Sequence, residues 1–255
     1  MLRPTVASPP VAQQKDNLCG PFWAARVLTE AGFIEVAGEP IDEDLIAIRA
    51  GTVLPDSETE VSVPPGATSR TVYRYELPVA PVDASGTSAV GLLKAIESAS
   101  GGALRCIPIR GLWTAERVER LVDEAPRLGA RLIANVRTGR LWASRPPVHV
   151  VLDELDGRRV EDPAADWDVG HFVELVMLIR GPRRSLVVVQ DSYPSLGWDG
   201  RHVQPPRVLA AALLRGDGRE GGVLAVVSRE SAAATAALVT ELGLEVGAWN
   251  NGTRS

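Results

Sequence analysis

Residues 170–193 read GHFVELVMLIRGPRRSLVVVQDSY, two apolar runs joined by a short segment that holds a Gly and a Pro. Runs of this kind around a turn signal predict two antiparallel strands in a hairpin. With a three-residue loop centred on Gly181, His171 lies directly opposite Asp191. Directly opposed residues have Cβ atoms about 4.5–5.5 Å apart, which lets a carboxylate accept a hydrogen bond from an imidazole. A two-residue loop or a bulge would instead bring Gln190 opposite His171 and turn the face over.

The rest of the chain predicts helices in its first half and mostly strands in its second. We expect helices at 19–31, 42–50, 88–99, 114–126, 206–215 and 231–243, and strands at 104–109, 131–136, 148–155, 159–162, 171–179, 185–191 and 222–228. This order favours an α+β fold, with a helical lobe at about 15–128 and a strand-rich lobe at about 129–255 within a single domain over 1–255. The proline-rich segment 52–87 is interpreted as an inserted loop, although a flap over a substrate would have the same composition.

The composition is that of an ordinary globular protein, with 45% hydrophobic residues and a formal net charge of -5. An acidic chain without a basic stripe excludes binding to a phosphate backbone, so no nucleic-acid partner is expected. The first residues, MLRPTVASPPVAQQ, contain no apolar run long enough for a signal peptide or a membrane span, so we expect a cytoplasmic protein with no membrane partner. The Arg-rich, Lys-poor composition is typical of a GC-rich bacterial genome.

A candidate nucleophile lies in the segment QQKDNLCGPFW, residues 13–23, where Cys19 opens a helix. The positive end of a helix and an adjacent imidazolium both favour the thiolate, which is the reactive form of cysteine. A Gln amide held before the helix, together with the N–H of Cys19, can donate two hydrogen bonds to the oxyanion of a tetrahedral intermediate. The alternative is that Cys19 is a small buried residue packed beside Trp23. Cys106, inside the apolar run LRCIPI, is interpreted as a core residue, and both thiols are expected to be free.

The segments QKDNLCGP, GHFVELV and VVVQDSYP together resemble the papain-like cysteine peptidases, and most closely the bacterial C39-like branch. The resemblance implies that Cys19 is the nucleophile, His171 the general base and acid, and Asp191 the residue that orients His171. It also implies that Gln14 donates to the oxyanion, with Gln13 as the alternative. It covers the two ends of the chain but not the middle, and Ser192 stands where many C39-like proteins have Pro.

Other polar residues are given structural interpretations. A zinc site that combines His149, placed in a strand, with Cys19 and His171 lacks a recognisable ligand spacing, so neither metal nor cofactor is expected. His202 is expected to be solvated in a polar loop. Tyr193 or Trp198 is a candidate to shield the bond between His171 and Asp191 from water.

The function that these residues favour is that of a cysteine peptidase or amide hydrolase, which acts on a peptide or amide through a thioester acyl-enzyme. A transpeptidase or acyltransferase with the same residues is one alternative. The other is a catalytically silent module of the same fold that binds a peptide.

Overall fold

The computed structural model of the chain describes residues 12–56 and 63–253. Its helices are α1 (Cys19–Glu30), α2 (Glu43–Arg49), α3 (Ala89–Ala99), α4 (Ala115–Glu124), α5 (Val148–Leu155), α6 (Pro206–Leu214) and α7 (Ala232–Glu241). Its strands are β1 (Glu35–Val36), β2 (Glu39–Pro40), β3 (Leu54–Pro55), β4 (Val79–Ala80), β5 (Leu104–Arg110), β6 (Arg131–Arg137), β7 (Gly170–Arg180), β8 (Ser185–Gln190), β9 (Arg201–Gln204), β10 (Gly222–Ser228) and β11 (Glu245–Val246). The predicted α+β class is confirmed.

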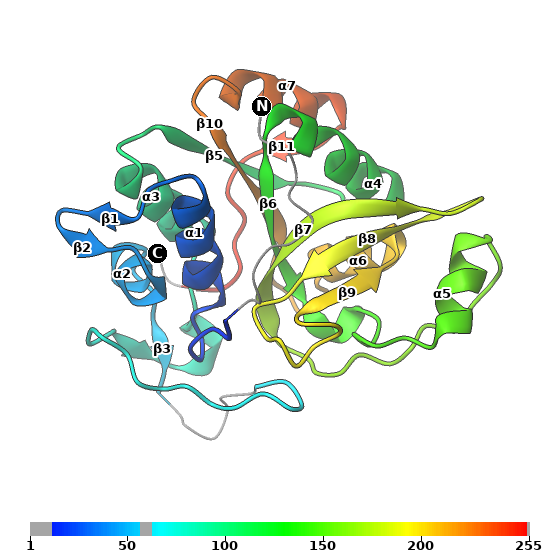
Figure 1. Cartoon of the computed structure of the whole chain (residues 1–255), viewed down its shortest axis with the longest axis horizontal. Helices are drawn as coiled ribbons and strands as arrows, with labels where there is room; N and C mark the ends of the chain where they lie inside the picture. Colours follow the sequence, from blue (N-terminus) through cyan, green and yellow to red (C-terminus); the bar gives the residue numbers. More distant parts are fainter. Residues whose placement is uncertain (1–11, 57–62, 254–255) are drawn as a thin grey trace.

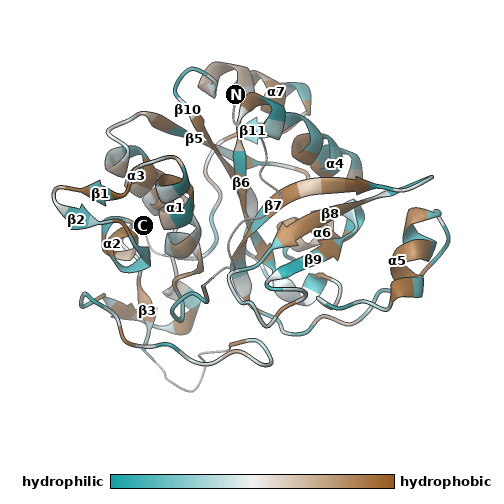
Figure 2. Ribbon diagram, in the orientation of Figure 1, coloured by the Kyte–Doolittle hydropathy of each residue, from teal (hydrophilic) through white to brown (hydrophobic). Residues whose placement is uncertain are grey.

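The central element is an antiparallel sheet in the order β11-β5-β10-β6-β7-β8-β9 (Figure 1). Alternate side chains of its strands enter two separate apolar cores. Leu132, Val173 and Val223 pack on one face with α4, α6 and α7, whereas Ile133, Phe172 and Leu224 pack on the other with α1, α2 and α3. The strands β5, β7 and β10 are accordingly hydrophobic along most of their length (Figure 2).

The sheet draws on both halves of the chain. β5 and α4 both precede residue 128, yet β5 pairs with β10 inside the sheet and α4 covers the face opposite α1. The predicted boundary near residue 128 therefore does not separate a helical part of the described structure from the sheet. Within the described part of the chain, no helix is both long and apolar enough to cross a membrane.

Helix α1 is held against β7 by two contacts close to the candidate catalytic residues. The indole Nε1 of Trp23 donates a hydrogen bond of 3.0 Å to the carbonyl of Phe172. A Cβ on Gly20 would lie 3.3 Å from the Phe172 ring, so the glycine after Cys19 permits the close approach of the helix. Pro21 fits the first turn, where its missing N–H is not needed.

The hairpin of β7 and β8 forms, but not in the predicted register. Arg180 pairs with Ser185, so the loop has four residues, 181–184, instead of three. A bulge at Val176 then shifts the pairing, and beyond it Leu175 pairs with Val189. The prediction that His171 lies directly opposite Asp191 is therefore wrong. If this register continued, the residue opposite His171 would be Tyr193, two residues after Asp191.

With the four-residue loop alone, the side chains of His171 and Asp191 would have lain on different faces of the sheet. The bulge adds one residue and so restores the shared face. His171 and Asp191 become diagonal neighbours, a separation that long side chains still span.

Segment 148–155 was predicted to be a strand and is helix α5. It begins after Pro147, whose carbonyl accepts from the N–H of Val150, and it ends at Leu155, two residues before Gly157, whose φ is 77°. Asp156 and Gly157 form the C-terminal cap of this helix; an Asp-Gly pair favours a hairpin turn equally well, because glycine serves both geometries. Residues 159–162, also predicted as a strand, form none, whereas β9 and the short strands β1, β2, β3, β4 and β11 were not predicted.

Candidate active site

Cys19 is the first residue of α1, so its backbone N–H has no carbonyl partner within the helix. The turn before it is tight, with Asn17 in the left-handed region at a φ of 63°, a conformation that asparagine tolerates well. The half-buried thiol borders a cavity of about 460 Å³. Residues that line this part of the cavity are Gln14, Asn17, Cys19, His171, Phe172 and Tyr193.

The structure brings His171 and Asp191 together in a buried contact. His171 lies near the start of β7 and Asp191 directly follows β8, and the imidazole Nε2 lies 3.2 Å from the carboxylate Oδ1. The same Oδ1 accepts a hydrogen bond of 2.9 Å from the N–H of Tyr193, which fixes the carboxylate in place. Because Asp191 occupies Nε2, Nδ1 is the ring nitrogen left for the thiol of Cys19.

Cys19 and His171 both line the cavity, so the thiol and the imidazole border the same space. Burial alone would lower the pKa of His171, but the charges of Asp191 and Cys19 and the hydrogen bonds to both outweigh it and raise the pKa to about 10. These contacts favour the protonated form of the imidazole. An imidazolium beside a sulfur is the arrangement that stabilises a thiolate.

Of the two candidate oxyanion donors, only Gln14 lies in the cavity. Its buried amide Nε2 donates to the carbonyl of Lys15 at 3.1 Å and to the hydroxyl of Tyr193 at 3.2 Å. The hydroxyl of Ser192 donates to Oε1 of Gln14 and lies 3.4 Å from Nε2 of His171. The amide of Gln13 instead donates to the carbonyl of Thr68 on the exposed side of the loop.

Aromatic rings cover the imidazole. Trp167 meets His171 edge to face with ring centroids 5.2 Å apart, and Tyr193 stacks on the same ring at 5.9 Å. Of the two predicted shields, Tyr193 takes this position, whereas Trp198 is 61% exposed. Trp167 was missed, although its place four residues before His171 was a usable signal.

The other two histidines were misplaced by the sequence analysis. His149 is exposed on α5, a helix that lies at the opposite end of the molecule from α1 (Figure 1). His202 is not solvated but buried in β9, where Nδ1 lies 3.0 Å from Nε2 of Gln204, and its burial lowers its pKa. Within 12–56 and 63–253, no group of three His, Cys, Asp or Glu side chains could hold a metal ion.

Segment 63–77, predicted as part of an inserted loop, braces the turn that carries Gln14. The buried carboxylate of Asp16 accepts from the Ser69 hydroxyl and from the Arg70 N–H, and the hydroxyl of Tyr73 donates to the Asp16 carbonyl at 3.0 Å. The turn and this segment therefore hold each other in place. Part of the predicted insertion, 57–62, lies outside the described residues.

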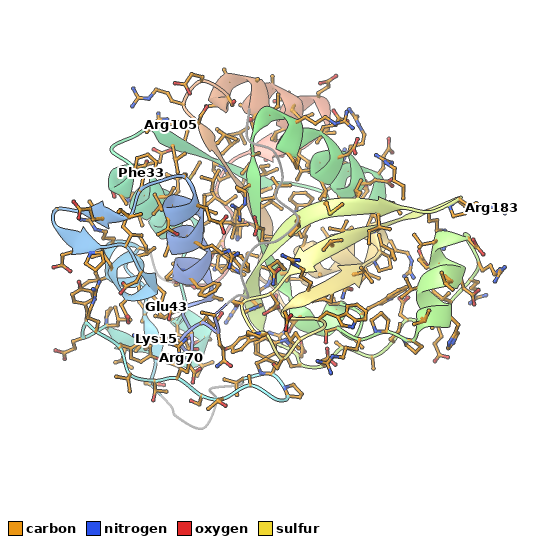
Figure 3. The ribbon with its side chains drawn as sticks, in the orientation of Figure 1. Lys15, Phe33, Glu43, Arg70, Arg105 and Arg183 are labelled. Carbon is orange, nitrogen blue, oxygen red and sulfur yellow. The ribbon has the colours of Figure 1, made fainter. Side chains whose placement is uncertain are left out.

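Helix α2 contacts the same turn. Figure 3 shows Lys15, Glu43 and Arg70 side by side. The carboxylate of Glu43 accepts 2.9 Å from the Lys15 N–H and lies 3.8 Å from the Arg70 guanidinium. Burial of Glu43 outweighs these favourable contacts and raises its pKa from 4.5 to about 7.

Comparison with known proteins gives a family but no activity. The chain matches, over residues 6–250, the model of a family described as a family of unknown function (DUF6885). No curated protein matches the chain.

Replacement of Glu43 by Gln should change how stability depends on pH. The pKa of Glu43 is higher in the folded than in the unfolded state, so its protonated carboxyl contributes fully to stability below about pH 4.5. This contribution is lost as the pH rises through about 7. Glu43→Gln should therefore remove up to about 3 kcal/mol of the fall in unfolding free energy across this interval. Urea denaturation at a series of pH values measures it. Glu76→Gln, at an exposed carboxylate, is the control and should retain the wild-type profile; the same profile in Glu43→Gln would contradict the assignment.

If Cys19 and His171 act as a pair, Cys19 should be alkylated rapidly by iodoacetamide at about pH 6, because an adjacent imidazolium makes a cysteine more reactive. His171→Ala should slow the reaction by about tenfold or more, since it removes that charge. His149→Ala, at the exposed histidine of α5, is the control. Peptide mapping separates Cys19 from Cys106, whose pKa is raised by burial and which should stay unlabelled. Equal rates in the wild type and His171→Ala would mean that the two side chains do not act as a pair.

Proposed function

The chain belongs to this family of unknown function, and we propose that it acts as a cysteine peptidase or amide hydrolase through Cys19, His171 and Asp191. The observation that carries the proposal is that Cys19 and the buried His171 line the same cavity, and that the imidazole contacts the buried carboxylate of Asp191. Structural cysteines are usually enclosed by apolar side chains, as Cys106 is, and have no such partners.

The proposed reaction has two stages. The Cys19 thiolate attacks the carbonyl carbon of a peptide or amide and forms a C–S bond, and the C–N bond breaks as His171 donates a proton to the leaving amine. A water molecule then attacks the thioester while His171 accepts its proton, and the C–S bond breaks to release the acid. Asp191 holds the ring with Nδ1 toward the sulfur in both stages.

The negative charge that develops on the carbonyl oxygen requires hydrogen-bond donors. The N–H of Cys19 is free of helical partners, and Gln14 is locked by Ser192 and Tyr193 on the same cavity wall. We propose that one N–H of the Gln14 amide exchanges the Tyr193 hydroxyl for the oxyanion. Ser192, which contacts both Gln14 and His171, then acts as a positioning residue that holds the Gln14 amide and the His171 imidazole at fixed positions relative to each other.

The arrangement supports a papain-like fold as the finer description of the α+β class. A helix that begins at the cysteine packs on an antiparallel sheet, and this sheet carries the histidine and leads into the aspartate. The C39-like branch and a cytoplasmic location belong to the same proposal.

Gln14→Ala should lower kcat by about 10²–10³, the usual effect of losing one oxyanion donor. Gln13→Ala is a matched control, because the neighbouring amide points to Thr68 and should leave kcat within about twofold of wild type. Both rates can be measured with a p-nitrophenyl ester of N-acetylalanine, which acylates a reactive thiol without a natural substrate. A similar loss in both variants would point to damage to the shared turn and not to a lost donor.

The same activated ester distinguishes hydrolysis from acyl transfer. Mass spectrometry should detect an acetylalanyl adduct on Cys19, absent in Cys19→Ser. With glycinamide added, a hydrolase yields mainly N-acetylalanine, whereas a transferase yields mainly the dipeptide amide. The absence of any adduct on wild-type Cys19 would leave the peptide-binding module as the better description and reject the enzyme.

A further inference from the structure

The cavity beside Cys19 also carries a group of arginines that the proposed reaction does not use. Arg137 from β6, Arg215 after α6, and Arg219 all line it, together with a single carboxylate residue, Asp168. These side chains come from segments distant from Cys19 in sequence, so the fold brings a set of cations to the candidate active site.

Two of the three arginines are neutralised by carboxylates. Arg137 donates from Nε to Asp168 at 2.5 Å. Arg215 is almost fully buried and donates to both oxygens of Asp217, at 3.2 and 2.8 Å. Gly170, the residue before His171, makes room for this pair, since a Cβ there would lie 2.9 Å from Nη2 of Arg215.

Arg219 is held in place but not neutralised. Its Nη2 donates 2.9 Å to the carbonyl of Asp83, and its guanidinium lies over Gly252, where a Cβ would come within 2.7 Å of Nε. Among the residues that the structure describes, no carboxylate lies within ion-pair distance of it. The contacts therefore fix the direction of the side chain and leave an uncompensated positive charge on the cavity wall.

We propose that Arg219 recognises a carboxylate on the substrate, so that the preferred substrates are short peptides or amides with a free carboxylate near the bond that Cys19 attacks. This inference rests on the proposed function. A planar guanidinium matches a carboxylate with two parallel hydrogen bonds, which makes arginine a specific reader of that group. A cavity of about 460 Å³ has the size of a small-ligand site and accommodates a few residues.

The charge preference of the cavity can be measured on Cys19 itself with two reagents of similar shape, anionic iodoacetate and neutral iodoacetamide. The ratio of the two alkylation rates cancels changes in thiolate reactivity. The rate with iodoacetate divided by the rate with iodoacetamide should fall about fivefold in Arg219→Gln, which is the effect of one partly exposed ion pair. It should be retained in Arg219→Lys. Arg183→Gln is the control for net charge, because Arg183 lies at the tip of the β7–β8 hairpin, far from α1 (Figure 3).

A ratio in Arg219→Gln within about twofold of wild type, or an equal fall in Arg183→Gln, would overturn the proposal. Thermal unfolding of each variant verifies that the fold persists, and the charge-conserving Arg219→Lys protein keeps the test decisive if Arg219→Gln is unstable. Failure of the proposed function has a different signature: slow alkylation by both reagents, independent of His171.

The source of the carboxylate is resolved by protection of Cys19 from iodoacetamide. N-acetylalanylalanine carries a C-terminal carboxylate, its amide carries none, and N-acetylglutamylalanine amide carries one on a side chain. Protection by the first and not the second assigns a C-terminal carboxylate, and protection by the third alone assigns a side-chain carboxylate. Equal protection by all three, unchanged in Arg219→Gln, counts against recognition by Arg219.

Discussion

The hydrogen bond from the indole of Trp23 to the carbonyl of Phe172 joins the two segments on which the candidate site depends. Trp23 lies one helical turn after Cys19, and Phe172 is the residue after His171. Both side chains are buried in the same core, so loss of this bond would leave a polar group without water or partner. The distance between the thiol and the imidazole is thus fixed by packing that is not itself part of the chemistry, and Gly20 allows it by accepting the Phe172 ring against the helix.

Features with local causes were predicted well from the sequence. The helices predicted to start at residues 42, 88 and 114 are formed, and the side chains of Asp42, Ser88 and Thr114 cap α2, α3 and α4. Such a cap is a local contact between residues three apart. The start of α1 at Cys19 was also found, although this helix has no side-chain cap, and the apolar runs of β7 and β8 were sufficient to predict the hairpin. The segment 148–155 failed because its signals, alternating valines and an Asp-Gly pair, are compatible with both a strand and a capped helix.

The contact between His171 and Asp191 was predicted by reasoning that was wrong in its detail. A loop one residue longer than expected would have separated their faces, and a bulge at Val176 that no sequence signal marks returned them to one face. Trp167 and Ser192 were overlooked as parts of the site because their partners are distant in the chain or depend on the turn geometry after β8. Residue types thus indicated the chemistry, but only the fold specifies which side chains support it.

Backbone strain gathers around this site. The non-glycine residues with positive φ in the described chain are Asn17, Ala37, Asp199 and Arg215. Asn17 and Arg215 line the cavity, and the carbonyl of Asp199 accepts from Gln190, which directly precedes Asp191. Asparagine and aspartate tolerate this conformation, but an arginine at a φ of 61° is held there only by its surroundings. Its bonds to Asp217 and Asn135 supply that restraint, at 2.8 and 3.2 Å. Because Asn135 belongs to β6 and Asp217 follows α6, the strained arginine joins these two segments on the cavity wall, and its bonds offset the cost of its backbone conformation.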